Sequence, residues 1–235
     1  MSPGPSYLSP TGKPFVKIPV SHGHLEAALR NPVGHPRGGA VLCHPHPVQG
    51  GTMHTKAVYR AARALNEAGI RTLRFNFRGV GCSTGSYNGG IGEEEDVRAA
   101  LDWLEMGLRD RPIIAGGLSF GSMVGLTVGV DDPRVVALVA MGTPIHVYDY
   151  SYLARAEKPV LVIQGEHDEF GSAREVGQVM GRLGSHVTVL SVPGAGHLFE
   201  GYLGELQKLI REYFTQGAGA LALNDGPGKT EGTTA

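Results

Sequence analysis

The 235-residue chain has only two cysteines, Cys43 and Cys82, and neither belongs to a C-x-x-C pair. Because two cysteines cannot form a disulfide scaffold, we interpret both as small packing residues of a protein from a reducing compartment. Long hydrophobic runs are also missing, since no window approaches the roughly 18 apolar residues that a membrane-spanning helix requires. The N-terminal stretch MSPGPSYLSPTGKP lacks the charged and apolar regions of a secretory signal. We therefore expect a cytoplasmic protein that does not bind membranes.

The chain also has no excess of charge of either sign. Its net charge is −1, and its 21 basic residues are scattered, which gives no electrostatic footprint for nucleic acid. With 41% hydrophobic and 18% charged residues, the composition is that of an ordinary globular protein. The C-terminal stretch GAGALALNDGPGKTEGTTA departs from it, being rich in glycine and threonine. We predict a single domain over residues 1–216 and a flexible tail over residues 217–235.

Short runs of β-branched residues alternate with amphipathic segments along the chain. This alternation is typical of an α/β fold, in which helices flank a mostly parallel sheet. About eight strands are expected, over residues 14–20, 24–32, 39–45, 71–77, 112–117, 135–142, 159–165 and 186–193. Apolar residues recur at helical spacing within 58–65, 97–108 and 203–213, and we interpret these stripes as core-facing sides of helices.

The pattern G-x-S-x-G occurs twice, as GCSTG around Ser83 and as GLSFG around Ser119. In the turn known as a nucleophile elbow, this serine follows a strand directly and precedes a helix directly. Ser119 meets both conditions, because it follows PIIAGG and opens the apolar segment FGSMVGLTVG. Ser83 lies in the glycine-rich stretch RGVGCSTGSYNGG, which indicates an irregular loop. We predict that Ser119 is a nucleophile and that Ser83 is structural.

A serine hydroxyl becomes a useful nucleophile when a histidine removes its proton and a carboxylate orients that histidine. Both partners should follow the serine in loops after later strands, the acid first. The loop GAGH supplies His197, for which the alternative is an ordinary surface histidine. The loop GEHDEF supplies Asp168, which stands three residues past the glycine that ends the preceding strand. Glu166 and especially Glu169 are alternative acids, and Asp168 could instead cap the following helix.

The tetrahedral intermediate of acyl transfer needs two donors for its negatively charged oxygen. The backbone N–H of Phe120, directly after the serine, is the first candidate. The segment HPHPVQGG supplies the second, and its two prolines have no N–H to give. This leaves the N–H of His46, with that of Val48 as the alternative.

The three histidines His44, His46 and His54 allow a second interpretation, a metal site. The cluster includes no carboxylate or cysteine, and His54 lies near the expected start of a helix. We therefore predict no metal and no cofactor.

Together these segments resemble the α/β-hydrolase superfamily, and within it the small members without a cap domain. They are similar to dienelactone hydrolases and to predicted esterases that carry HPHPxxGG and RFNFRGVGxSxG. The resemblance covers residues 14 to 214 and implies an α/β-hydrolase fold with Ser119 as nucleophile, Asp168 as acid and His197 as base. Dienelactone hydrolases use a cysteine nucleophile, and this chain departs from them at Ser119.

The expected substrate is a small molecule with an accessible ester. Only 14 residues, 145–158, connect the strands at the place where other hydrolases insert a lid, so an open cleft is expected. Three tyrosines there, Tyr148, Tyr150 and Tyr152, would line a wall of the cleft or cover the core. The predicted activity is a carboxylesterase, and the alternatives are an acyltransferase, a thioesterase, a peptidase or a non-catalytic binding protein. An oxidoreductase is disfavoured because RGVGCSTG misses the G-x-G-x-x-G spacing. The oligomeric state is unknown.

Overall fold

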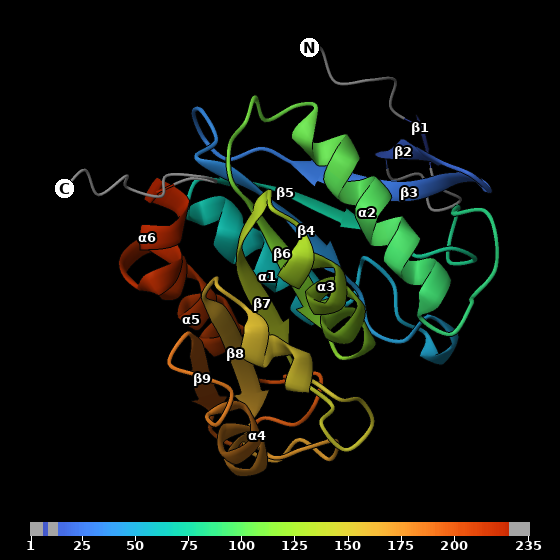
Figure 1. Cartoon of the computed structure of the whole chain (residues 1–235). Coiled ribbons are helices and arrows are strands. Elements are labelled where there is room, and N and C mark those ends of the chain that lie inside the picture. The colour runs from blue at the N-terminus through green and yellow to red at the C-terminus, as the bar shows by residue number, and fades with distance from the viewer. Residues whose placement is uncertain (1–6, 9–13, 226–235) are drawn as a thin grey trace.

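The computed structural model describes residues 7–8 and 14–225. They form one nine-stranded sheet with helices on both faces (Figure 1). Its strands are β1 (Tyr7–Leu8), β2 (Pro14–Val20), β3 (Gly23–Arg30), β4 (Gly38–Cys43), β5 (Ile70–Phe75), β6 (Ile113–Leu118), β7 (Val135–Met141), β8 (Val160–Gly165) and β9 (Val187–Val192). The helices are α1 (Lys56–Glu67), α2 (Ile91–Glu105), α3 (Phe120–Asp131), α4 (Ala173–Met180), α5 (Leu203–Gln216) and α6 (Ala218–Asp225), with short 3₁₀ helices η1 (Pro47–Gln49) and η2 (Ser151–Arg155).

The strand order is β1-β2-β3-β5-β4-β6-β7-β8-β9. The first three strands and β5 pair antiparallel, and every pair from β5 to β9 is parallel. All eight strands expected from the sequence are present, and the mostly parallel α/β prediction is confirmed. The ninth strand, β1, has only two residues, too few for a β-branched run to reveal it.

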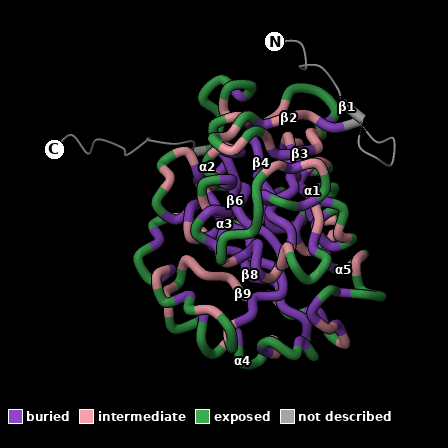
Figure 2. The backbone as a smooth tube through the Cα atoms, turned by 90° about the vertical axis from the view of Figure 1, so that its right-hand side faces the viewer, coloured by how far each residue is buried: buried purple, intermediate pink, exposed green. Residues whose placement is uncertain are grey.

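The core consists of two apolar layers, one on each side of the sheet. Alternate residues of each strand enter opposite layers, as the period of two requires: Val41 packs into the layer under α2, α3 and α4, and Leu42 into the layer under α1, α5 and α6. The central strands β4, β6 and β8 are buried along their full lengths, which explains their largely apolar sequences. Figure 2 shows this buried interior, with exposed backbone concentrated in the outer loops and helices.

The prediction of a flexible tail is wrong for the start of that segment. Residues Ala218–Asp225 form α6, which packs against α5 and β7. Leu223 is buried there, and a Cβ atom at Gly38 would lie 3.2 Å from its side chain. Alanine and leucine are strong helix formers, so the run ALAL outweighs the glycines around it. Residues 226–235 of the expected tail lie outside the described residues.

Long apolar helices are not found in the described part of the chain. No helix over residues 14–225 has both the length and the apolar character needed to cross a bilayer.

Candidate active site

Ser119 lies in a tight turn between β6 and α3, as the sequence predicts. Its backbone has φ 56° and ψ −123°, a conformation that costs a non-glycine residue about 1–3 kcal/mol. The glycines on either side make the turn possible. A Cβ atom at Gly117 would lie 2.5 Å from the carbonyl oxygen of Cys43, and one at Gly121 would collide with the carbonyl oxygen of His44. The turn therefore packs directly against the backbone at the end of β4 and the residue that follows it.

The structure brings together the three residues chosen as nucleophile, base and acid. The Nε2 atom of His197 lies 2.8 Å from Oγ of Ser119. On the other side of the ring, Nδ1 of His197 lies 2.8 Å from Oδ2 and 3.0 Å from Oδ1 of Asp168. His197 is 9% exposed and Asp168 is 4% exposed, so the pair is shielded from bulk water. The alternative that His197 is an ordinary surface histidine is therefore wrong.

Besides His197, two further groups donate hydrogen bonds to the Asp168 carboxylate. The Phe170 N–H donates to Oδ1 at 2.9 Å, and the side-chain amide of Gln164 donates to Oδ2 at 2.7 Å. Gln164 is fully buried in β8, and its amide oxygen accepts a hydrogen bond from the Thr143 N–H at 2.6 Å. We did not predict Gln164 from the sequence, although a polar side chain inside the apolar strand VLVIQG was a usable signal.

The other carboxylates of this loop have different contacts. Glu166 accepts a hydrogen bond from the Gly194 N–H at 2.8 Å, and Glu169 lines the pocket beside Ser119. The helix that follows is capped by Ser172, whose Oγ accepts from the Glu175 N–H. Asp168 is therefore free of the capping role that the sequence also allowed.

Two backbone N–H groups near Ser119 are available to a ligand. Within residues 14–225, neither the His46 N–H nor the Phe120 N–H has a hydrogen-bond acceptor. The rings of these residues lie 5.0 Å apart, centroid to centroid, so both residues border the same space. Val48, the alternative donor, lies in η1, and its side chain is exposed.

A pocket of about 330 Å³ opens beside Ser119 and His197. It is lined by Pro45, His46, Gln49, Gly50, Gly51, Thr55, Phe120, Pro144, Val147, Tyr148, Glu169, Phe170 and Leu198 in addition to these two residues. Glu169 is the only acidic side chain among these lining residues, and no lysine or arginine is among them. Burial lowers the pKa of His46, which favours its neutral form. The pocket therefore presents one negative charge and a largely uncharged wall.

The tyrosines of the β7–β8 connection separate into two groups. Tyr150 is buried in the core, and both Tyr148 and Tyr152 pack against that core, but only Tyr148 also lines the pocket. The only helix in this connection is η2, five residues long, so no lid covers the pocket from here. A larger hollow of about 770 Å³ lies between β7, η2 and α6, but none of the candidate residues lines it.

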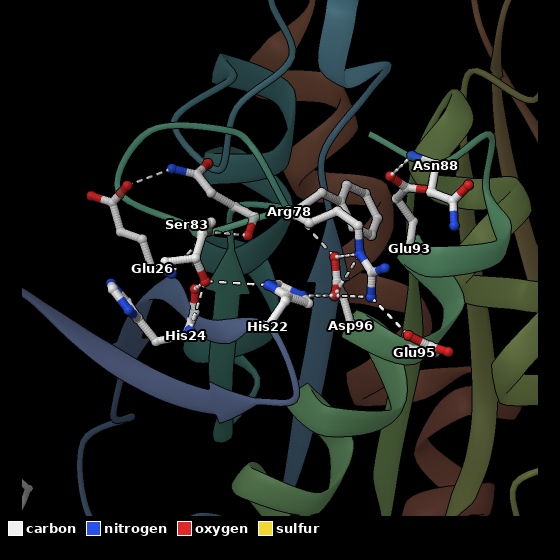
Figure 3. Close-up of polar contacts among 12 residues, drawn as sticks. His22, His24, Glu26, Arg78, Ser83, Asn88, Glu93, Glu95 and Asp96 are labelled. Atoms are coloured by element: carbon white, nitrogen blue, oxygen red, sulfur yellow. Dashed lines mark hydrogen bonds and ion pairs between the residues drawn. The ribbon is translucent and has the colours of Figure 1, made fainter. Parts of the chain in front are cut away.

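The hydroxyl of Ser83 forms hydrogen bonds that hold the fold together (Figure 3). Its Oγ donates to the Asn76 carbonyl at 2.7 Å and accepts from the Glu26 N–H at 2.9 Å. The same loop is fixed to α2 by Arg78, whose guanidinium forms an ion pair with buried Asp96 at 2.8 Å. These contacts join the loop after β5 to β3 and α2, and they leave the Ser83 hydroxyl engaged on both sides.

The histidines that suggested a metal do not form such a site. Among the described residues, no three histidine, cysteine, aspartate or glutamate side chains form a group that could hold a metal ion. Both ring nitrogens of His44 contact backbone atoms instead. Burial strongly raises the pKa of the Cys43 thiol, which keeps it protonated.

Comparison with known proteins shows the family to which this chain belongs. Residues 40–205 match the family described as an alpha/beta hydrolase domain. An uncharacterized protein of Rickettsia prowazekii is 36% identical over 183 residues, which are 74% of this chain and 77% of that protein. An alpha-beta serine hydrolase homologue from Coxiella burnetii is 36% identical, with a TM-score of 0.79 over 84% of this chain and 95% of that chain.

A second solved structure, from Xanthomonas campestris, is described as an a/b serine hydrolase without lid. It is 31% identical, with a TM-score of 0.79 over 90% of this chain and 94% of that chain. The family match covers well over half of the 235 residues. The chain therefore belongs to the alpha/beta hydrolase domain family.

Proposed function

We propose that this protein is a serine carboxylesterase that works through an acyl-enzyme intermediate. The observation that carries the proposal is the continuous chain of contacts from Ser119 through His197 to Asp168, with distances of 2.8 Å at both ends of the imidazole. An ionised Asp168 carboxylate accepts hydrogen bonds but donates none. It therefore keeps the ring proton of His197 on Nδ1. The bare Nε2 then faces the Ser119 hydroxyl, as a general base must.

Each chemical step has a residue in position for it. His197 takes the Ser119 proton as Oγ attacks the ester carbonyl, and the Asp168 charge stabilises the imidazolium that forms. His197 then gives this proton to the departing alcohol as the C–O bond breaks, which leaves the acyl group on Ser119. A water molecule, activated by His197 in the same way, releases the carboxylic acid.

The negative charge that develops on the carbonyl oxygen needs donors that are already in place. We assign this role to the N–H groups of His46 and Phe120, which border the pocket and have no acceptor within the described residues. Fixed donors of this kind are typically worth about 10²–10³ in kcat each.

The pocket supports an uncharged ester of modest size as the substrate. A volume of about 330 Å³ accommodates a small acyl or alcohol group, and the β7–β8 connection provides no lid to enclose a long chain. The Glu169 carboxylate disfavours anionic substrates, and no lysine or arginine among the lining residues compensates for it. The 31% identical protein from Xanthomonas campestris, described as lidless, supports the same kind of open site.

The experiment that tests the proposal is a kinetic comparison of ester, thioester and amide substrates that carry the same short acyl group. We expect the highest kcat/KM on the ester, with loss of activity in Ser119→Ala. A preference for the thioester or the amide would assign the site to a thioesterase or a peptidase. Transfer of the acyl group to an added alcohol in preference to water would indicate an acyltransferase. A pure, folded protein without turnover of any member would contradict the proposal and favour a binding protein.

A further inference from the structure

His44 lies directly before the segment that carries the proposed donor His46, and its ring is fully buried. Its Nδ1 atom lies 2.6 Å from the Pro45 carbonyl oxygen, and its Nε2 atom lies 3.0 Å from the Phe77 nitrogen. A carbonyl oxygen only accepts and a backbone N–H only donates, so Nδ1 must carry the proton and Nε2 must be bare. Two backbone groups thus select one neutral tautomer of His44.

The bond to the Pro45 carbonyl bears on the next residue. The Pro45 carbonyl and the His46 N–H belong to the same peptide unit, which is planar and trans, so they point in opposite directions. When His44 holds the Pro45 oxygen on one side, the His46 N–H must point to the other. The orientation of the proposed oxyanion donor is therefore coupled to one side-chain hydrogen bond.

The other side of His46 is fixed as well. Its carbonyl oxygen accepts from the N–H groups of Gln49 and Gly51, both at 3.1 Å. Gly51 packs so closely that a Cβ atom there would lie 2.8 Å from this oxygen. Since Pro45 and Pro47 have no N–H, the His46 N–H is the only backbone donor of the Pro45–Pro47 segment.

The anchor at the far end of the imidazole is rigid. Phe77 is fully buried, its ring meets the His44 ring edge to face at 4.8 Å, and its carbonyl accepts from the Val80 N–H. Burial also lowers the pKa of His44 to about 4, which keeps the ring in the neutral form that both contacts require.

We propose that His44 is a positioning residue that aims the His46 N–H at the carbonyl oxygen of the substrate through its Nδ1–H contact with Pro45. This inference rests on the proposed function for the identity of the donor. It assigns separate roles to the two nitrogens: Nδ1 orients the donor, and Nε2 attaches the ring to Phe77, just past the end of β5.

Two substitutions separate these roles. The amide nitrogen of asparagine can take the place of Nδ1 and keep the bond to Pro45, whereas the amide oxygen of glutamine can take the place of Nε2 and keep the bond to Phe77. We expect His44→Gln to lower kcat on a short p-nitrophenyl ester by about 10- to 100-fold with KM changed by less than about threefold. His44→Asn should retain kcat within about fivefold of the unaltered enzyme. Both substitutions should lower the melting temperature by similar amounts. As controls, His35→Gln and His35→Asn, at an exposed position, should change neither kcat nor the melting temperature.

The rate at which a fluorophosphonate modifies Ser119 provides the second readout. This reaction also places an oxygen at the donors but does not depend on the ester being the true substrate. If the unaltered enzyme is labelled without hydrolysing esters, the proposed function fails and the labelling rates of the two variants still test His44. Slower labelling of His44→Gln than of His44→Asn supports the inference. Equal losses in both, a change confined to KM, or no labelling of the unaltered enzyme would overturn it.

A measurement on the unaltered protein covers the case in which neither variant folds. Nitrogen-15 NMR of the imidazole should show Nδ1 protonated and Nε2 bare at neutral pH. The opposite tautomer would overturn the inference, because Nδ1 could not then donate to Pro45.

Discussion

The Oδ2 atom of Asp168 lies 2.8 Å from Nδ1 of His197, whereas the next residue, Glu169, lines the pocket. Asp168→Asn should therefore lower kcat by about 10³- to 10⁴-fold, because the amide no longer fixes the histidine tautomer or stabilises the imidazolium. Glu169→Gln should change the rate on an uncharged ester by less than about threefold and raise the rate on an anionic ester. Steady-state kinetics with both esters measures this difference. A larger loss in Glu169→Gln than in Asp168→Asn would transfer the role of acid to Glu169.

Ser83 provides a contrast to Ser119 within the same sequence pattern. Ser83→Ala removes the acceptor of the buried Glu26 N–H and the donor to Asn76, so it should lower the free energy of unfolding by about 1–3 kcal/mol. Its kcat should stay within about threefold of the original value. Urea unfolding and ester kinetics on the same preparation give both numbers. A loss of turnover without a loss of stability would show that Ser83 takes part in the chemistry.

His44 should make the stability of the fold depend on pH. Its pKa is about 4 in the native protein and about 6.5 in an unfolded chain, so between these values the unfolded chain binds a proton that the native state does not. Stability from this group is complete above about pH 6.5 and is lost as the pH falls towards 4, by about 3 kcal/mol in total. Urea unfolding should therefore show the advantage of the unaltered protein over His44→Asn shrinking as the pH is lowered. An advantage that does not change with pH would contradict the buried, neutral histidine.

Chain-length selectivity should follow from the open pocket. Each fully buried methylene is worth about 0.8 kcal/mol, but without a lid only the first few carbons of an acyl chain can be buried. We expect kcat/KM on p-nitrophenyl esters to peak at roughly two to six acyl carbons, measured across a series of saturated chains. A steady rise to long chains would mean that Tyr148 and the segment 44–51 form a deep tunnel in solution.

The strands and the turn at Ser119 could be predicted because their signals are local. Strand β8 is a short apolar run, rich in β-branched residues, that ends in glycine. Ser119 stands between a short apolar run that predicts a strand and a longer apolar segment without proline that predicts a helix. Asp168 and His197 followed from their positions after predicted strands, since the carboxyl ends of parallel strands meet at one edge of the sheet.

The remaining features depend on contacts between distant parts of the chain. The buried amide of Gln164 has its backbone hydrogen-bond partners only when β8 lies beside Thr143 and Gly171. The helix α6 is stabilised by burial of Leu223 near Gly38, a contact across most of the chain. The contact of His44 Nε2 with the Phe77 N–H likewise requires that β4 and β5 lie side by side.

The central claim is that Ser119 is the residue that accepts the acyl group. Intact and peptide mass spectrometry of the protein, quenched during turnover of a short p-nitrophenyl ester, tests it directly. We predict one acyl adduct per chain on the peptide that contains Ser119, absent in Ser119→Ala and present in Ser83→Ala. An adduct on another residue, or turnover that persists in Ser119→Ala, would contradict the account.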